Sequence, residues 1–120
     1  MRLLIADDER GFAAALAEVV QSWGHGVVEV VFSGLGAIRA YQRHRPDLVL
    51  MDYNMGRLNG LTACRNIVSS DPAARIVFLS GVGAAEELPG DLGGAVGFLR
   101  KPVKMEELQQ LLASFEGPGG

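Results

Sequence analysis

An uninterrupted apolar run that ends in an acid is the feature that most restricts the fold of this chain. Residues 48–51 read Leu-Val-Leu-Met without any alternation of apolar and polar side chains, and Asp52 follows them. A strand without alternation is buried on both faces, as in parallel sheets whose faces are covered by helices. We therefore predict a strand of a parallel sheet over residues 47–52.

The remainder of the chain alternates between strand-like and helix-like segments. Apolar runs predict four further strands over residues 2–7, 27–32, 75–80 and 95–100. Between and after them, apolar residues recur at the spacing of one helix face. The residues that mark these helices are Phe12, Leu16, Val19, Val20 and Trp23; Leu35, Ile38 and Tyr41; Leu61, Cys64, Ile67 and Val68; and Met105, Leu108, Leu111, Leu112 and Phe115. The pattern predicts an α/β fold: a doubly wound, five-stranded parallel sheet with helices on both faces.

Composition excludes several classes of protein. The 120 residues suit one domain, and the 48% hydrophobic content supplies a core. A formal net charge of -3 argues against direct nucleic-acid binding, and one cysteine excludes an internal disulfide. No apolar run reaches the roughly 18 residues of a membrane helix, and the start of the chain lacks the features of a signal peptide. We expect a cytoplasmic protein that does not enter a membrane.

Two glycine-rich stretches mark the weakest parts of the pattern. Residues 81–97 carry six glycines together with Pro89, so we predict a fourth helix that is short or irregular and limited to residues 84–88. Gly-Pro-Gly-Gly at residues 117–120 cannot extend a helix. We therefore predict one domain over residues 1–116, followed by a tail or linker stub over residues 117–120.

Polar residues follow the apolar runs at the carboxyl ends of the predicted strands. In a doubly wound sheet these ends meet at one rim, where ligands bind. The residues placed there are Asp7, Asp8 and Glu9 after the first strand, Asp52 at the third, Ser80 at the fourth, and Arg100, Lys101 and Pro102 at the fifth. The sequence therefore predicts one polar site built from distant segments.

The charges of this rim predict its chemistry. Two carboxylates about 4 Å apart repel each other by roughly 4 kcal/mol at an effective dielectric constant near 20. Asp7, Asp8 and Asp52 therefore need a proton or a cation, and carboxylate ligands suit Mg²⁺. An aspartate can attack phosphorus and form an aspartyl-phosphate. The metal, Lys101 and the Ser80 hydroxyl would then each meet one phosphoryl oxygen.

These motifs resemble the receiver domain family of two-component response regulators. The resemblance extends to about Phe115 and rests on Asp-Asp at 7–8, Asp-Tyr-Asn-Met at 52–55 with Gly60, Ser-Gly at 80–81 and Lys-Pro at 101–102. It implies a flavodoxin-like receiver fold in a phosphorelay. The implied partner is a sensor histidine kinase or a phosphotransfer protein, with an effector that the sequence does not identify. Catalysis would be limited to the protein's own phosphorylation and dephosphorylation.

The resemblance also implies a role for each site residue. Asp52 would be the phosphoacceptor, Asp8 a direct Mg²⁺ ligand, and Asp7 a ligand largely through water. The backbone carbonyl of Asn54 would complete the protein's metal ligands. Lys101 would contact the phosphoryl group.

Two further residues would form a switch. Ser80 would sense the phosphoryl group, and Phe98 fills the aromatic position three residues before the lysine. The Lys101-Pro102 bond would be cis. Gly56 stands where the family often has proline, so the loop after the third strand is expected to be looser.

Other interpretations are less consistent with the sequence. A receiver-like module that works without phosphate would be expected to have lost acids or the lysine, and both are present. A haloacid dehalogenase-type phosphatase needs a second acid two residues after its nucleophile, where this chain has Asn54. Dinucleotide binding through Gly34-Leu35-Gly36 lacks the third glycine, because Arg39 occupies that position.

Overall fold

A single parallel sheet organises the protein. The computed structural model describes residues 1–56, 58–81 and 88–116. Within them, five strands lie in the order β2-β1-β3-β4-β5, and every neighbouring pair is parallel. In chain order the elements are β1 (Arg2–Ala6), α1 (Arg10–Ser22), β2 (Gly26–Val31), α2 (Gly34–His44), β3 (Leu48–Asp52), α3 (Gly60–Ser70), β4 (Ile76–Ser80), the 3₁₀ helix η1 (Leu92–Gly94), β5 (Gly97–Arg100) and α5 (Met105–Glu116).

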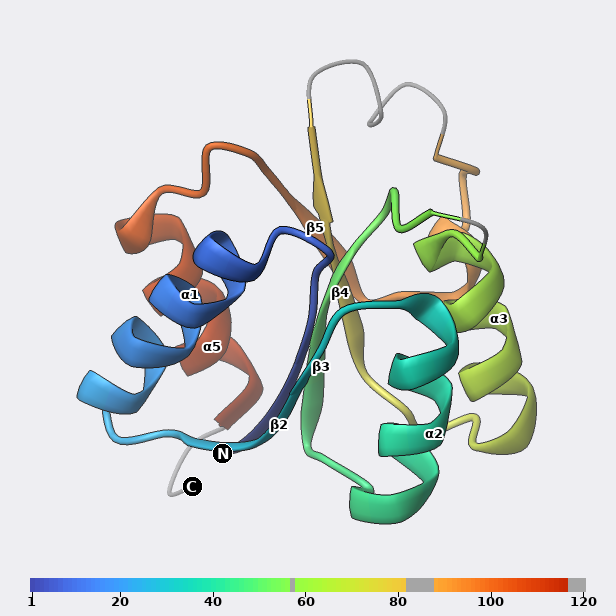
Figure 1. Ribbon diagram of the computed structural model, residues 1–120, viewed down its shortest axis with the longest axis horizontal. Helices are drawn as coiled ribbons and strands as arrows, with labels where there is room; N and C mark the ends of the chain where they lie inside the picture. Colours follow the sequence, from blue (N-terminus) through green and yellow to red (C-terminus); the bar gives the residue numbers. More distant parts are fainter. Residues whose placement is uncertain (57, 82–87, 117–120) are drawn as a thin grey trace.

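Helices cover both faces of the sheet and give the molecule three layers. Figure 1 shows α1 and α5 on one side of the sheet and α2 and α3 on the other. Each side has its own apolar core: Leu16 and Leu108 belong to the first, and Tyr41 and Ile67 to the second. This is the doubly wound, flavodoxin-like arrangement that the sequence predicts.

β3 lies in the middle of the sheet, between β1 and β4. All five of its residues are buried, and so are all five of β4. Alternate side chains of β3 enter the two cores, with Leu48 and Leu50 on one side and Val49 and Met51 on the other. The uninterrupted apolar run is therefore explained by burial on both faces.

The helix ends follow local capping chemistry. The Ser33 side chain accepts a hydrogen bond from the backbone N–H of Gly36 at 3.0 Å, so Ser33 is the N-cap of α2. Asn59 caps α3 in the same way through Thr62. Gly24 has a φ of +94° just beyond α1, as expected for a residue that closes a helix.

Strand boundaries differ from the sequence predictions by one or two residues. β1 ends at Ala6 rather than at residue 7, and β5 begins at Gly97 rather than at residue 95. Pairing with the neighbouring strand decides these limits: Gly97 is the first residue of β5 that pairs with β4. Apolar character alone does not locate the first paired residue.

The segment before β5 packs on α3. Leu92, Gly93 and Gly94 all have positive φ values. A Cβ atom on Gly93 would collide with the Leu61 side chain, so a side chain there is excluded by packing as well as by conformation. The predicted fourth helix, apart from residue 88, and the predicted tail lie outside the described residues. Among the described helices, none is long and apolar enough to cross a membrane.

Candidate functional site

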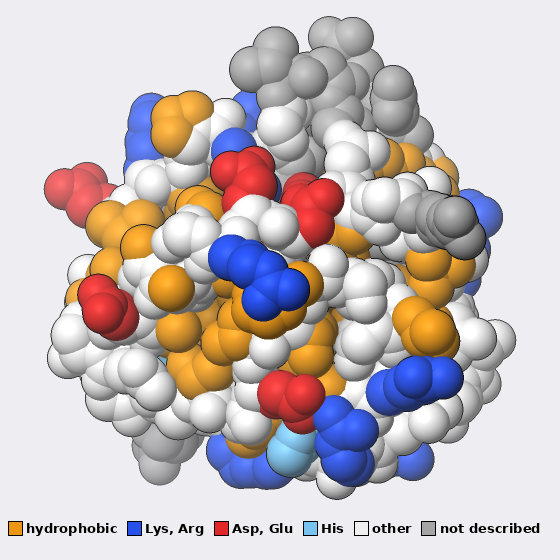
Figure 2. All heavy atoms as spheres, in the orientation of Figure 1, with side chains coloured by type: hydrophobic (Ala, Val, Ile, Leu, Met, Phe, Trp, Pro, Cys, Tyr) orange, Lys and Arg blue, Asp and Glu red, His pale blue; other side chains and the backbone are white. Residues whose placement is uncertain are grey.

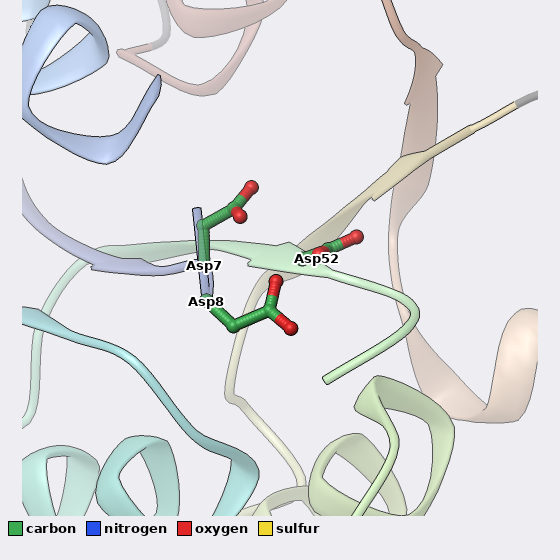
Figure 3. Close-up of side chains that lie close together, drawn as sticks. All are labelled: Asp7, Asp8 and Asp52. Atoms are coloured by element: carbon green, nitrogen blue, oxygen red, sulfur yellow. The ribbon is translucent and has the colours of Figure 1, made fainter. Parts of the chain in front are cut away.

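Three aspartates meet at the carboxyl ends of β1 and β3. Asp7 and Asp8 follow β1, Asp52 ends β3, and all three point into the same space (Figure 3). One carboxylate oxygen from each lies within 4.8 Å of the other two. Figure 2 shows acidic side chains close together at this rim of the molecule. The predicted convergence of Asp7, Asp8 and Asp52 is therefore present.

Backbone hydrogen bonds of the sheet fix these positions. The N–H of Asp7 donates to the Val31 carbonyl at 3.0 Å, which anchors the end of β1 against β2. The N–H of Lys101 donates to the Ser80 carbonyl at 2.7 Å, so the lysine leaves β5 beside the end of β4. The Lys101-Pro102 peptide bond is cis, as predicted.

Asp7 is fully buried and has a partner for each carboxylate oxygen. Its Oδ1 accepts from the backbone N–H of Glu9 at 2.9 Å, and its Oδ2 accepts from Lys101 Nζ at 2.8 Å. A buried carboxylate needs such partners to remain charged. Asp8, by contrast, is exposed and its carboxylate faces the cleft.

Asp52 is buried with weaker partners. The backbone N–H of Asn54 donates to its Oδ1 at 3.4 Å, and Lys101 Nζ lies 3.6 Å from its Oδ2. Burial, followed by the negative charge of Asp7, raises the pKa of Asp52 to about 6, although Lys101 acts in the opposite direction. The carboxylate that is least stabilised in this cluster is therefore the one at the end of β3.

Lys101 supplies the cation of the site. Its Nζ lies 2.8 Å from Asp7, 3.6 Å from Asp52 and 3.6 Å from Glu9. Burial opposes its charge, but the hydrogen bond to Asp7 and the nearby carboxylates outweigh that effect and raise its pKa. Sequence reasoning placed the lysine on the same rim as the acids, and the structure shows that it is paired most closely with Asp7.

The Ser80 hydroxyl at the end of β4 lacks a hydrogen-bond partner. Within the part of the chain that the structure describes, it is the one buried side-chain polar atom in that condition. Leaving a buried hydroxyl unpaired costs about 1–3 kcal/mol, so an orphan of this kind suggests a group that binds later.

The other predicted site residues lie around this centre. Asn54 is exposed in the loop after β3, two residues beyond Asp52. Phe98 lies on the edge strand β5 and is 41% exposed. The Phe98 side chain is therefore largely open to solvent in this structure.

Sequence reasoning named Glu9 and Gly60 but did not find their contacts, and it did not place Phe12 at the site. Glu9 reaches Lys101, and the ring centroid of Phe12 lies 4.6 Å from the lysine Nζ, although its helical spacing marked Phe12 only as core. Gly60 packs on the main chain of Asp52 and Tyr53; a Cβ atom there would lie 2.9 Å from Tyr53 Cα. The sequence signal for this contact is that Gly60, a residue without a side chain, is the first residue of α3.

Comparison with known proteins identifies the family. The family model of the response regulator receiver domain matches residues 3–113. The chain belongs to the response regulator receiver domain family. The match covers the five strands except Arg2, together with most of α5, so the family assignment and the fold agree over the same residues.

This chain matches nearly the full length of some relatives and only about half the length of others. Chemotaxis protein CheY of Bacillus subtilis is 30% identical over 112 residues, which are 92% of this chain and 93% of the relative. Response regulator MprA of Mycobacterium leprae is 34% identical over 90% of this chain but only 47% of its own length. A CheX-CheY-BeF₃-Mg complex from Borrelia burgdorferi has a similar chain, with a TM-score of 0.89 and 26% identity over 98% of this chain and 90% of that one.

Proposed function

We propose that this receiver domain accepts a phosphoryl group on Asp52 with Mg²⁺ bound beside it. The observation that carries the proposal is the shared cleft of three aspartates and one lysine, closed by a buried hydroxyl that has no partner. Asp7 and Asp52 are both buried, and Asp52, the proposed nucleophile at the end of β3, has the longer polar contacts of the two. The Ser80 hydroxyl has no hydrogen-bond partner, so it could donate to an oxygen of a phosphoryl group bound at Asp52.

The donor set fits a divalent cation. Asp8 presents an exposed carboxylate, Asp7 and Asp52 add two buried ones, and the Asn54 carbonyl is proposed as the remaining ligand from the protein. Mg²⁺ prefers one or two carboxylates together with waters and phosphate oxygens. When bound, it supplies charge neutralisation for the acids and for the incoming phosphoryl group. The magnesium and beryllofluoride named for the Borrelia complex support a site for Mg²⁺ and a phosphoryl group in this chain.

The chain's own residues would then carry out a simple displacement. A carboxylate oxygen of Asp52 attacks the phosphorus of a phosphohistidine and forms an O–P bond as the P–N bond breaks. The electron pair of the broken bond stays on the imidazole of the donor. Lys101 and the Ser80 hydroxyl each meet one phosphoryl oxygen, and hydrolysis by water later returns the Asp52 carboxylate.

Intact mass tests the proposal directly. The protein is incubated with acetyl phosphate and Mg²⁺, and with the same donor in the presence of a chelator. We expect the mass of one phosphoryl group only with Mg²⁺, and none in Asp52→Asn. No gain in the wild type under any condition, or an equal gain in Asp52→Asn, would refute the assignment.

We propose in addition that Ser80 and Phe98 form the switch. A phosphoryl oxygen would draw the Ser80 hydroxyl toward Asp52, which opens space into which the Phe98 ring turns. Such a change is a two-state packing switch driven by local charge. Structures with and without a beryllofluoride mimic test the coupling, since an outward Phe98 in both states contradicts it.

The partners follow from the same chemistry. We propose a sensor histidine kinase or phosphotransfer protein as donor, with a cytoplasmic location and an effector still to be identified. A haloacid dehalogenase-type phosphatase is disfavoured because the chain belongs to the receiver domain family and has the sheet order β2-β1-β3-β4-β5. Signalling without phosphate is disfavoured by the complete set of acids and lysine in one cleft.

A further inference from the structure

We propose that Glu9 controls which phosphodonors reach Asp52, by holding Lys101 at the mouth of the cleft and repelling anionic donors. This inference rests on the proposed function, because it concerns the rate of the same phosphorylation. Glu9 acts through Lys101 and through its own charge, so it is a positioning and selectivity residue.

The contacts of Glu9 place a full charge at the entrance. Its side chain is 70% exposed, and its Oε1 lies 3.6 Å from Lys101 Nζ, the same separation as between Lys101 and Asp52. The backbone N–H of Glu9 donates to the buried Asp7 at 2.9 Å, which fixes the main chain from which the side chain extends. Glu9 is therefore held beside the lysine while its carboxylate remains open to incoming ligands.

Glu9 and Asp52 compete for one cation. Lys101 Nζ also lies 4.6 Å from the ring centroid of Phe12, so its position is defined by an aromatic ring below it and by carboxylates around it. A lysine that shares its charge with Glu9 is less available to a phosphoryl oxygen at Asp52. Removing the Glu9 charge leaves Phe12 and Asp7 in place and frees the lysine toward Asp52.

The charge balance of the cleft makes Glu9 decisive. With Mg²⁺ bound, the metal and Lys101 together offset Asp7, Asp8 and Asp52. Among the groups paired with Lys101, the charge that remains is that of Glu9, so an anionic donor meets a negative side chain beside the lysine. Arg10 forms none of the described ion pairs with Glu9, and its guanidinium lies 3.9 Å from the ring centroid of Phe32.

This repulsion has two measurable signatures. It grows with the charge of the donor, so acetyl phosphate, a dianion at neutral pH, is slowed more than phosphoramidate, a monoanion. It also weakens as salt rises, because exposed charges are screened over about 8–10 Å at physiological ionic strength. A structural role for Glu9 would change neither the donor preference nor its salt dependence.

The experiment compares wild type with Glu9→Gln and Glu9→Lys, and with Glu18→Gln as the matched control. Glu18 is exposed on α1 and forms none of the described ion pairs with Lys101. Glu18→Gln therefore changes the net charge of the protein by the same amount as Glu9→Gln without altering the contacts of the lysine. Phosphorylation rates with both donors are measured with Mg²⁺ at low and high salt. Beryllofluoride affinity is measured by fluorine NMR as a readout that needs no turnover.

We expect Glu9→Gln to raise the acetyl phosphate rate about two- to fivefold at low salt, with Glu9→Lys higher still. The phosphoramidate rate rises less, beryllofluoride binds more tightly, and the differences shrink at high salt. Equal rates and affinities in Glu9→Gln and Glu18→Gln at every salt concentration would overturn the inference while the proposed function stands. A wild type that takes no phosphoryl group from either donor would instead overturn the proposed function.

Discussion

Replacing Asp52 with asparagine should make the metal-free protein more stable at neutral pH. Asparagine keeps the size and shape of the side chain and removes its charge. In the fold that charge is buried, lies near Asp7, and has only distant partners. The predicted gain therefore comes from relief of burial and repulsion, and not from a new contact.

The magnitude follows from the pKa of Asp52. A pKa of about 6 in place of the ordinary 3.8 corresponds to roughly 3 kcal/mol, at about 1.4 kcal/mol for each pH unit. The attraction of Lys101 is already contained in that pKa, because the lysine lowers it while burial and Asp7 raise it. We therefore expect a gain of about 3 kcal/mol, or a melting temperature about 12 °C higher for a domain of this size.

The sign of the pH dependence is fixed by the same shift. The folded protein holds the Asp52 proton up to about pH 6, whereas the unfolded chain releases it near pH 3.8. Between these values the folded state binds more protons, so the Asp52 contribution to stability falls as pH rises and is flat above pH 6. Asparagine has no such dependence, and the advantage of the variant should be largest above about pH 7.

Urea unfolding in the presence of a chelator measures the difference. Wild type, Asp52→Asn and the surface control Glu18→Gln are compared at pH 5 and pH 8, with circular dichroism as the signal. We expect a gap between wild type and Asp52→Asn that widens from pH 5 to pH 8. A less stable variant at pH 8 would show that the Lys101 attraction outweighs the repulsion, and a gap that is the same at both pH values would show that folding does not raise the pKa of Asp52.

Three further predictions concern single residues of the site. Asp8→Ala should weaken Mg²⁺ binding in calorimetry more than Asp7→Asn, because both oxygens of Asp7 already have partners in the protein; equal affinities would contradict this. Ser80→Ala should leave the unfolding free energy unchanged or raise it by about 1 kcal/mol in urea titrations, because it removes an unpaired buried hydroxyl. Gly60→Ala should lose about 2 kcal/mol in the same assay, because the added Cβ meets the main chain at Asp52.

Much of the fold and the identity of the site acids could be predicted because both depend on local sequence. The apolar run before Asp52 reveals a strand buried on both faces, and parallel strands bring their carboxyl ends to one rim. Asp7, Asp8 and Ser80 follow apolar runs of the same kind. Their convergence is a consequence of topology and needs no knowledge of side-chain geometry.

The pairing within the site could not be predicted because it depends on side-chain direction and on distances across the sheet. The position of Lys101 after its strand does not reveal that Asp7 is nearer to it than Asp52. Neither does helical spacing reveal that Phe12 lies under the lysine. Leu92 and Gly93 likewise have positive φ values where the segment packs against α3. The composition of the segment does not reveal that packing.

The position of Lys101 implies an order of events at the site. In the proposed function, Lys101 Nζ, which lies 2.8 Å from Asp7 and 3.6 Å from Asp52, would divide its charge between Asp7 and a phosphoryl oxygen on Asp52. Asp7 is fully buried, so losing the lysine without a replacement cation would leave an uncompensated charge. Neutralisation of Asp7 by a cation would therefore accompany or precede any shift of Lys101 toward Asp52. In the proposed function, a divalent cation would thus serve the buried acid that shares the lysine as well as the acid that would accept the phosphoryl group.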